Sequence, residues 1–199
     1  MKKFELTNEF VTNMFGTKLF RIRALVEFGD VEAGELGGYV EKESNLGHDD
    51  NAWVYGDAQV SGDARVYDNA RVYGDAWVYG DAWVYGNALV CGNARVYDNA
   101  RVYGDAWVYG NARVCGDALV CGDARVCGNG DYAYAHGFGS VNRTTTFFRL
   151  KDGGVGVRCG CFYGTLAQFR DKIRETHGET KKAQEYLMLA DLMKLRFEK

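Results

Sequence analysis

Apolar and polar positions recur every six residues between Asn51 and Gly128. The segment divides into thirteen units of the form Asn/Asp-Ala-x-Val-Tyr/Cys/Ser-Gly/Asp, such as NAWVYG and DARVYD, without an insertion. Ala fills the second place and Val the fourth in all thirteen, whereas the third place holds Trp, Arg, Leu or Gln. Residues two apart share one face of an extended strand. The pattern therefore predicts short strands that bury Ala and Val and turn the third and fifth residues outward.

The residues between these strands are Gly, Asp and Asn, which tolerate left-handed backbone angles and so form tight corners. A flat antiparallel sheet would instead need turns of varying length. The repeat resembles the hexapeptide repeat of left-handed parallel β-helices, in which three six-residue units form one triangular coil. The resemblance covers 78 residues and implies a mostly β solenoid with 18 residues per coil. Val40 and Leu46 are also six apart, which predicts a starting coil.

The flanks differ from the repeat, so we predict three regions: 1–33, 34–128 and 129–199. In the first, segments around Phe15-Gly16 alternate as in a β-hairpin, expected to cap the first coil. In the last, DYAYAH, TTTFFRLKD and GVGVRCGCF are typical of short strands. A capping box at 165–168 opens a helix that Gly178 ends, and a second amphipathic helix is expected at 181–197.

Residues eighteen apart should be neighbours in successive coils, roughly 4.8 Å apart. This spacing places each Trp of the repeat beside an Arg and forms columns of Tyr. One interpretation is a set of ladders that stabilise the solenoid by cross-strand stacking. The other is a binding surface, because these residue types are enriched at interface hot spots. The candidate residues on the coil faces are Trp53, Trp77, Trp83, Trp107, Arg71, Arg95, Arg101, Tyr79, Tyr85 and Tyr103.

A second candidate site lies in GFGSVNRTTTFF of the C-terminal region. Ser140, Asn142, Arg143 and Thr144 offer donors suited to an anion, at the lip of an expected pocket. A plain hairpin loop is the alternative, since no helix follows directly as a phosphate loop requires.

The cysteines indicate free thiols. Four of them occupy the Tyr place of the repeat, and the pair that shares a face, Cys91 and Cys127, should be about 9.6 Å apart, beyond disulfide reach. Cys159 and Cys161 form C-x-C rather than the C-x-x-C of redox or zinc pairs. We therefore expect a reducing cytosol, no metal and no cofactor.

The net charge and the positions of the histidines limit the classes of function that the sequence supports. The net charge is −3 and the pI about 5.7, which argues against binding to a nucleic-acid backbone. No run of 18 apolar residues and no secretory signal is visible, so we expect a cytoplasmic protein without a membrane span. The three histidines, His48, His136 and His177, all lie outside the thirteen units. No convincing catalytic constellation emerges.

A second resemblance rests on LGGYVEKESNLGHDDNAWVYG and FFRLKDGGVGVRCGCFYGTL. These stretches look like an uncharacterised group of phage and prophage hexapeptide-repeat proteins, often labelled transferases. The resemblance implies a bacterial cytosol, a homo-oligomer with a trimer favoured, and a counter-defence role. We expect a non-catalytic binding protein that engages a host protein or a small anionic nucleotide-like ligand. The alternatives are an acyltransferase-like enzyme with His48 or His177 as base, and a purely structural solenoid.

Overall fold

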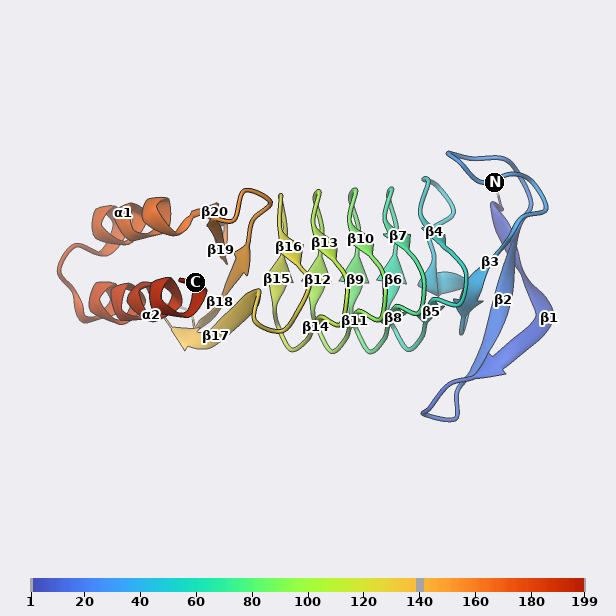
Figure 1. The fold of residues 1–199 in the computed structure, drawn as a ribbon, viewed down its shortest axis with the longest axis horizontal. Coiled ribbons are helices and arrows are strands. Elements are labelled where there is room, and N and C mark those ends of the chain that lie inside the picture. Colours follow the sequence, from blue (N-terminus) through green and yellow to red (C-terminus); the bar gives the residue numbers. More distant parts are fainter. Residues whose placement is uncertain (1, 139–141, 199) are drawn as a thin grey trace.

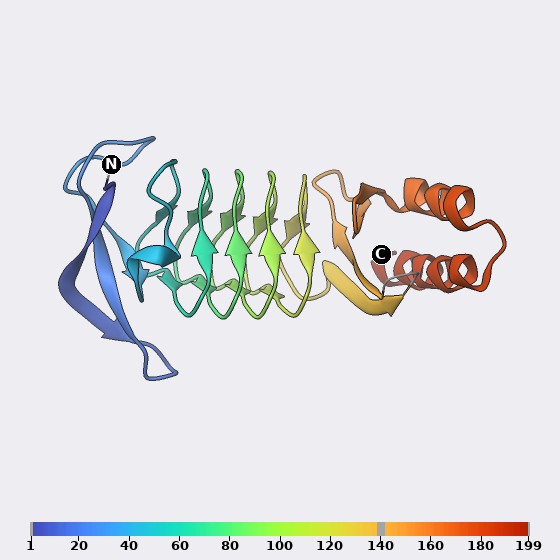
Figure 2. The ribbon, with the colours of Figure 1, turned by 180° about the vertical axis from the view of Figure 1, so that it is seen from behind.

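The protein is a rod with a different cap at each end (Figure 1). The structure is a computed structural model and describes residues 2–138 and 142–198. A β-hairpin covers the N-terminal end of a central solenoid, and a small sheet with two helices covers the other end (Figures 1 and 2).

The solenoid is built from thirteen two-residue strands in the part of the chain that the structure describes. They are β4 (Trp53–Val54), β5 (Gln59–Val60), β6 (Arg65–Val66), β7 (Arg71–Val72), β8 (Trp77–Val78), β9 (Trp83–Val84), β10 (Leu89–Val90), β11 (Arg95–Val96), β12 (Arg101–Val102), β13 (Trp107–Val108), β14 (Arg113–Val114), β15 (Leu119–Val120) and β16 (Arg125–Val126). Parallel pairing joins strands eighteen residues apart, as in Leu89 with Trp107. The predicted β-solenoid with an 18-residue coil is confirmed.

The coils present three sheet faces, which we name by their strands. The first face is β4-β7-β10-β13-β16, the second contains β5-β8-β11-β14, and the third is β6-β9-β12-β15. The Ala and Val side chains of all thirteen units are fully buried between the faces. Burial of one small and one branched apolar residue per unit gives the solenoid its continuous core.

The corners require left-handed backbone angles. Most are made by Gly, but Asp68 and Asp98 take the same place, with φ of 58° and 57°. Each aspartate accepts a hydrogen bond from a backbone N–H of the next coil, Asp68 from Gly86 at 3.0 Å and Asp98 from Gly116 at 3.1 Å. The carboxylate thus compensates for a backbone angle that glycine adopts more easily.

The N-terminal cap begins with the expected hairpin of β1 (Phe4–Thr12) and β2 (Lys18–Ala24). Strand β3 (Leu36–Val40) pairs antiparallel with β2 and parallel with β5, and a short 3-10 helix η1 (Glu43–Asn45) follows. Val40 aligns with Val60, and Leu46 forms a bridge with Val66. The expected starting coil is therefore present.

The C-terminal module contains an antiparallel sheet and two helices. The sheet order is β17 (Tyr132–Phe138), β18 (Arg143–Arg149), β19 (Val155–Cys159) and β20 (Phe162–Thr165). Helix α1 (Leu166–His177) starts with a capping box at Thr165, and α2 (Lys181–Phe197) packs against it, as expected. One side of the sheet contacts the last coil and the other contacts the helices.

Among the described residues, no helix is long and apolar enough to cross a membrane.

Candidate functional site

The outward Trp and Arg side chains of the solenoid pair with one another. Arg95 lies over the Trp77 ring at 4.8 Å, and Arg125 lies over Trp107 at 4.3 Å. Trp83 has Arg101 on one side at 4.7 Å and Arg65 on the other at 5.8 Å. These cation–π pairs each contribute about 0.5–1 kcal/mol when exposed.

The tyrosines form stacks along all three faces in the same way, and on the first face Tyr55 and Tyr73 stack at 4.4 Å with their planes 11° apart. Tyr79 and Tyr97 stack at 5.0 Å on the second face, and Tyr67, Tyr85 and Tyr103 stack at 4.9 Å spacing on the third. The rings of the stacks on the second and third faces are parallel to within 5°. The stacking that the first interpretation expects is present, and such cross-strand contacts stabilise paired strands.

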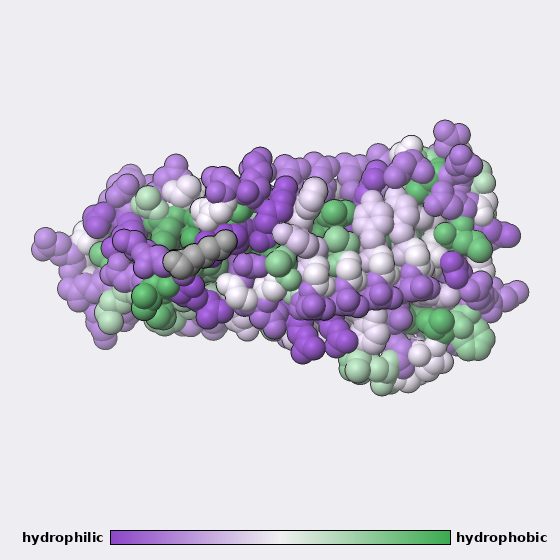
Figure 3. Space-filling view, viewed as in Figure 1, coloured by the Kyte–Doolittle hydropathy of each residue, from purple (hydrophilic) through white to green (hydrophobic). Residues whose placement is uncertain are grey.

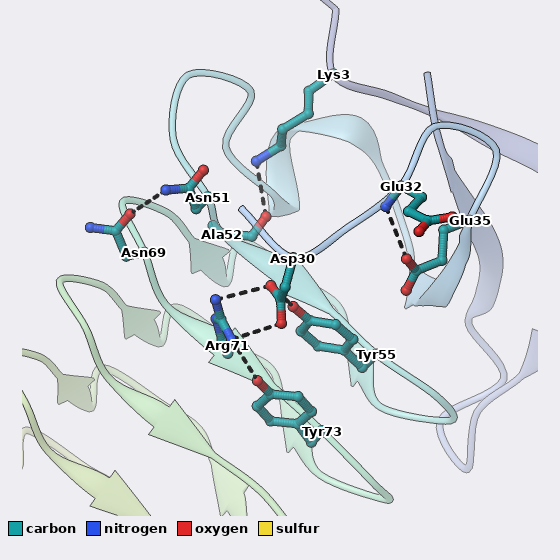
Figure 4. A network of polar contacts seen from close by, with 10 residues as sticks. All are labelled: Lys3, Asp30, Glu32, Glu35, Asn51, Ala52, Tyr55, Asn69, Arg71 and Tyr73. Carbon is teal, nitrogen blue, oxygen red and sulfur yellow. Dashed lines mark hydrogen bonds and ion pairs between the residues drawn. The ribbon is translucent and has the colours of Figure 1, made fainter. Parts of the chain in front are cut away.

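Two coil-face candidates are not on the open surface. Trp53 is fully buried, because Phe4 and Phe28 of the N-terminal cap pack edge-on against its ring. Arg71 does not stack on Trp53 but forms an ion pair with Asp30 at 3.0 Å, as Figure 4 shows. The expected exposure of Trp53 is therefore wrong, because the N-terminal cap packs over the first face. The predicted pairing of Trp53 with Arg71 in neighbouring strands is present.

Apolar side chains that remain exposed lie mainly in the two end caps. Phe10, Met14 and Phe15 protrude from the hairpin, and Met188, Leu192 and Leu195 from α2. Figure 3 agrees, since the larger green patches lie toward the ends of the rod, whereas the solenoid is mostly pale or purple with smaller green spots in that view. The solenoid sides thus offer mixed aromatic and basic surface rather than a continuous apolar patch.

A cavity of about 270 Å³ lies in the C-terminal module, between the sheet and the helices. Its lining is Arg143, Cys159, Cys161, Phe162, Phe169, Lys172, Ile173, Thr176, His177 and Tyr186. The floor is therefore aromatic and aliphatic, and basic side chains stand at its edge. Ligand pockets share this composition, with mostly apolar walls and a few polar groups that orient the ligand.

Strand β18 divides the predicted lip between two sides of the sheet. Arg143 lines the cavity, whereas the Thr144 hydroxyl hydrogen-bonds His136 Nδ1 at 2.9 Å. Asn142 is an exposed turn residue with φ of 49° and is not among the residues that line the cavity. Ser140 lies outside the described residues. Of the lip residues that the structure describes, only Arg143 lines the cavity.

A chain of hydrogen bonds holds the inner wall of the cavity. The Thr145 hydroxyl donates to Cys159 Sγ at 3.2 Å, and the Tyr186 hydroxyl lies 3.8 Å from that sulfur and donates to the Phe138 carbonyl at 3.2 Å. Burial is the main reason that the pKa of Tyr186 rises to about 12. Tyr186 is therefore a neutral phenol at pH 7 and a rigid wall for a ligand.

The charge at the cavity edge is only partly compensated. Lys172 pairs with Glu175 at 3.0 Å. Arg143 forms no ion pair within the described part of the chain, and its guanidinium lies against Gly160. A planar guanidinium that has no carboxylate partner is suited to bidentate binding of a carboxylate or phosphate.

The three histidines occupy different surroundings. His48 stacks on Phe4 at 4.4 Å and accepts a hydrogen bond from the Lys3 backbone, and burial lowers its pKa. His136 uses the same nitrogen, Nδ1, toward Thr144 and, at 3.8 Å, toward Asp117, so it does not bridge the two as a catalytic triad requires. His177 lines the cavity and stacks on Tyr186 at 6.0 Å.

All six cysteines are free thiols, as the repeat geometry predicted. Cys121 is nevertheless buried rather than exposed, because the C-terminal module covers its end of the third face. Cys159 and Cys161 both line the cavity. No group of three or more metal-ligating side chains occurs among residues 2–138 and 142–198.

Comparison with known families agrees with the coil geometry. A profile of the YdcK Beta solenoid repeat matches residues 58–70, 64–80, 94–110, 106–122 and 112–128. The chain is a β-solenoid repeat protein. The matched segments lie within the solenoid and include neither the hairpin nor the C-terminal module. No curated protein matches the chain significantly.

The sequence gives little sign of the cavity because its lining comes from five separate elements: β18, β19, β20, α1 and α2. The alternation in RTTTFFR was a usable signal, since it places Arg143, Thr145 and Phe147 on one side of β18. Phe147 indeed packs with the helices, whereas Phe148 packs with the solenoid core. Which helix residues meet that side was not deducible from spacing.

Proposed function

We propose that the protein is a non-catalytic binding protein whose C-terminal cavity holds a small anionic, ring-containing ligand of nucleotide type. The observation that carries this proposal is Arg143, a cation without an ion-pair partner among the described residues, at the edge of a cavity floored by Phe162, Phe169 and Tyr186. The aromatic floor suits a planar ring, and the guanidinium suits a phosphate.

The size of the cavity limits the ligand. Its volume of about 270 Å³ lies just below the usual range of roughly 300–1,000 Å³ for ligand pockets. One mononucleotide is therefore the largest occupant that fits the proposal. A protein that only sequesters such a molecule needs no catalytic group, which is also consistent with a counter-defence role in a phage setting.

Isothermal titration calorimetry with cyclic AMP and cyclic GMP tests the proposal. We expect one of them to bind and Arg143→Gln to weaken that binding about tenfold or more, since a hydrogen bond to a charged group contributes roughly 1.5–3 kcal/mol. Arg113→Gln is the matched control, because Arg113 is exposed on the second face and does not line the cavity. Absence of binding by both nucleotides, or equal weakening by both variants, would contradict the proposal.

A further inference from the structure

The tyrosine stack of the third face has an open end next to the N-terminal cap. Leu46 aligns with Val66, so the next residue of each segment, Gly47 and Tyr67, also align. Gly47 donates its N–H to the Val66 carbonyl at 2.8 Å, and its Cα carries no side chain to cover the Tyr67 ring. The column that continues through Tyr85 and Tyr103 at 4.9 Å steps therefore begins with an empty position.

The neighbouring outward column ends in the same coil. Asn45 aligns with Arg65, but its side chain turns inward, is fully buried and donates to the carbonyls of Gly62 at 3.0 Å and Ala64 at 2.8 Å. Two adjacent outward positions of the starting coil therefore lack side chains. The result is a hollow of about 390 Å³, lined by Ser44, Gly47, Arg65, Val66, Tyr67 and Trp83.

The chemistry of this hollow suits a ring and an anion together. The exposed face of Tyr67 can accept a further stacked ring, and base–aromatic stacking contributes about 1–3 kcal/mol. Arg65 is exposed beside it and forms no ion pair with a carboxylate among the described residues. Ser44 adds a hydroxyl that can donate to an anion.

We propose that this hollow, the tyrosine shelf, binds a planar aromatic anion such as a nucleoside monophosphate. Its ring occupies the empty position of the stack on Tyr67, and its phosphate contacts Arg65. The shelf lies at the opposite end of the rod from the C-terminal cavity, so the two sites are independent (Figure 1).

The surroundings favour a free small molecule over a nucleic-acid strand. The corner between the second and third faces carries a row of aspartates, Asp63, Asp81, Asp98 and Asp117. A phosphate backbone that followed the third face would run beside these carboxylates and be repelled. A single phosphate at Arg65 avoids most of that row.

Calorimetric titration with AMP in the Arg143→Gln background tests the shelf while any binding in the C-terminal cavity is weakened about tenfold or more. We expect AMP to bind, adenosine to bind about tenfold more weakly, and Arg65→Gln to reduce AMP affinity about tenfold. Gly47→Tyr should abolish binding, because its ring would extend the stack into the empty position.

Two further measurements decide the outcome. Arg65 is exposed, so Arg65→Gln should unfold at the parent temperature, and Arg113→Gln should leave AMP affinity unchanged. A short single-stranded oligonucleotide should bind no more tightly than AMP. Failure of AMP to bind, an unchanged affinity in Arg65→Gln, or tighter binding of the oligonucleotide would overturn the proposal. Arg65 and Gly47 line the shelf and not the cavity, so an effect of either substitution on AMP affinity does not depend on the function proposed for the cavity.

Discussion

At the scale of single residues, neighbours eighteen apart explain most outward contacts. Trp77 with Arg95 and Trp107 with Arg125 are paired as the spacing predicts. The exceptions occur where a segment outside the repeat reaches the coil. Asp30 accepts hydrogen bonds from Arg71 and from the Tyr55 hydroxyl, both at 3.0 Å (Figure 4). Periodicity carries no information about such a segment, so these contacts could not be predicted.

Trp53 supplies the prediction at this scale. Its ring is fully buried, and its Nε1–H has no hydrogen-bond partner in the part of the chain that the structure describes. Trp53→Phe keeps an aromatic ring between Phe4 and Phe28 and removes the unsatisfied donor, so we expect a loss of about 1 kcal/mol or less in the free energy of unfolding. Trp53→Ala should cost about 3–5 kcal/mol, because it leaves a cavity.

Urea unfolding of the two variants measures this difference. Trp107→Ala is the matched control, since Trp107 is 44% exposed and its loss should cost much less than that of Trp53. Equal losses for Trp53→Phe and Trp53→Ala would show that packing around this ring does not matter.

At the scale of elements, the last coil has no following coil whose carbonyls could accept hydrogen bonds from its backbone N–H groups. These N–H groups therefore need other acceptors. Within the solenoid, Arg101 donates its N–H to the Ala118 carbonyl one coil further on. At the end of the solenoid, side-chain oxygens take the place of that carbonyl. Asn129 Oδ1 accepts from the backbone N–H of Arg113, and Thr146 Oγ1 accepts from the backbone N–H of Leu119, both at 2.9 Å. The C-terminal sheet therefore caps the coil by hydrogen bonding as well as by covering its core.

Thr146→Val tests this capping. Thr146 is fully buried, and the substitution keeps its shape but leaves the Leu119 N–H without an acceptor. We expect the free energy of unfolding to fall by about 1–3 kcal/mol. Thr144→Val on the same strand is the control, with an expected change within about 0.5 kcal/mol, because its hydroxyl partner His136 is exposed. Chemical denaturation of both variants measures the difference. Equal free energies of unfolding for Thr146→Val and Thr144→Val would contradict the capping role.

At the scale of the whole molecule, the solenoid is a stack in which each coil contacts mainly its neighbours. Stability in such a protein is approximately the sum of the coil terms and the interface terms between coils. The length of the rod is therefore a variable that can be changed without altering either cap.

Removal of one coil is the corresponding prediction. Deleting residues 87–104, which contain β10, β11 and β12, removes eighteen residues and leaves every remaining Ala and Val of the repeat facing inward. We expect this variant to fold with a cooperative thermal transition followed by circular dichroism. Deleting only residues 87–89 shifts the pattern by an odd number, which turns inward side chains outward, so we expect that variant to fail to fold. If the variant without residues 87–104 did not fold, the view that stability is a sum of terms from the coils and their interfaces would be contradicted.

The sequence by itself determined the solenoid, because a strict six-residue repeat leaves one arrangement in which all thirteen Ala and Val pairs are buried. It also determined the hairpin, the starting coil and both helices, whose signals are local alternation, spacing and capping residues. Of the C-terminal lip it indicated Arg143, the residue that the structure places at a cavity.

Only the tertiary structure decided which outward residues of the repeat remain exposed on the surface of the protein. Trp53 and Trp107 occupy the same place in their repeats, yet one is fully buried and the other 44% exposed, because Phe4 and Phe28 of the N-terminal cap pack against Trp53. The cavity and the tyrosine shelf likewise form where the regular coil meets a segment of different pattern. Contacts within the repeat follow from its period, whereas contacts at its ends depend on how the two caps fold against it.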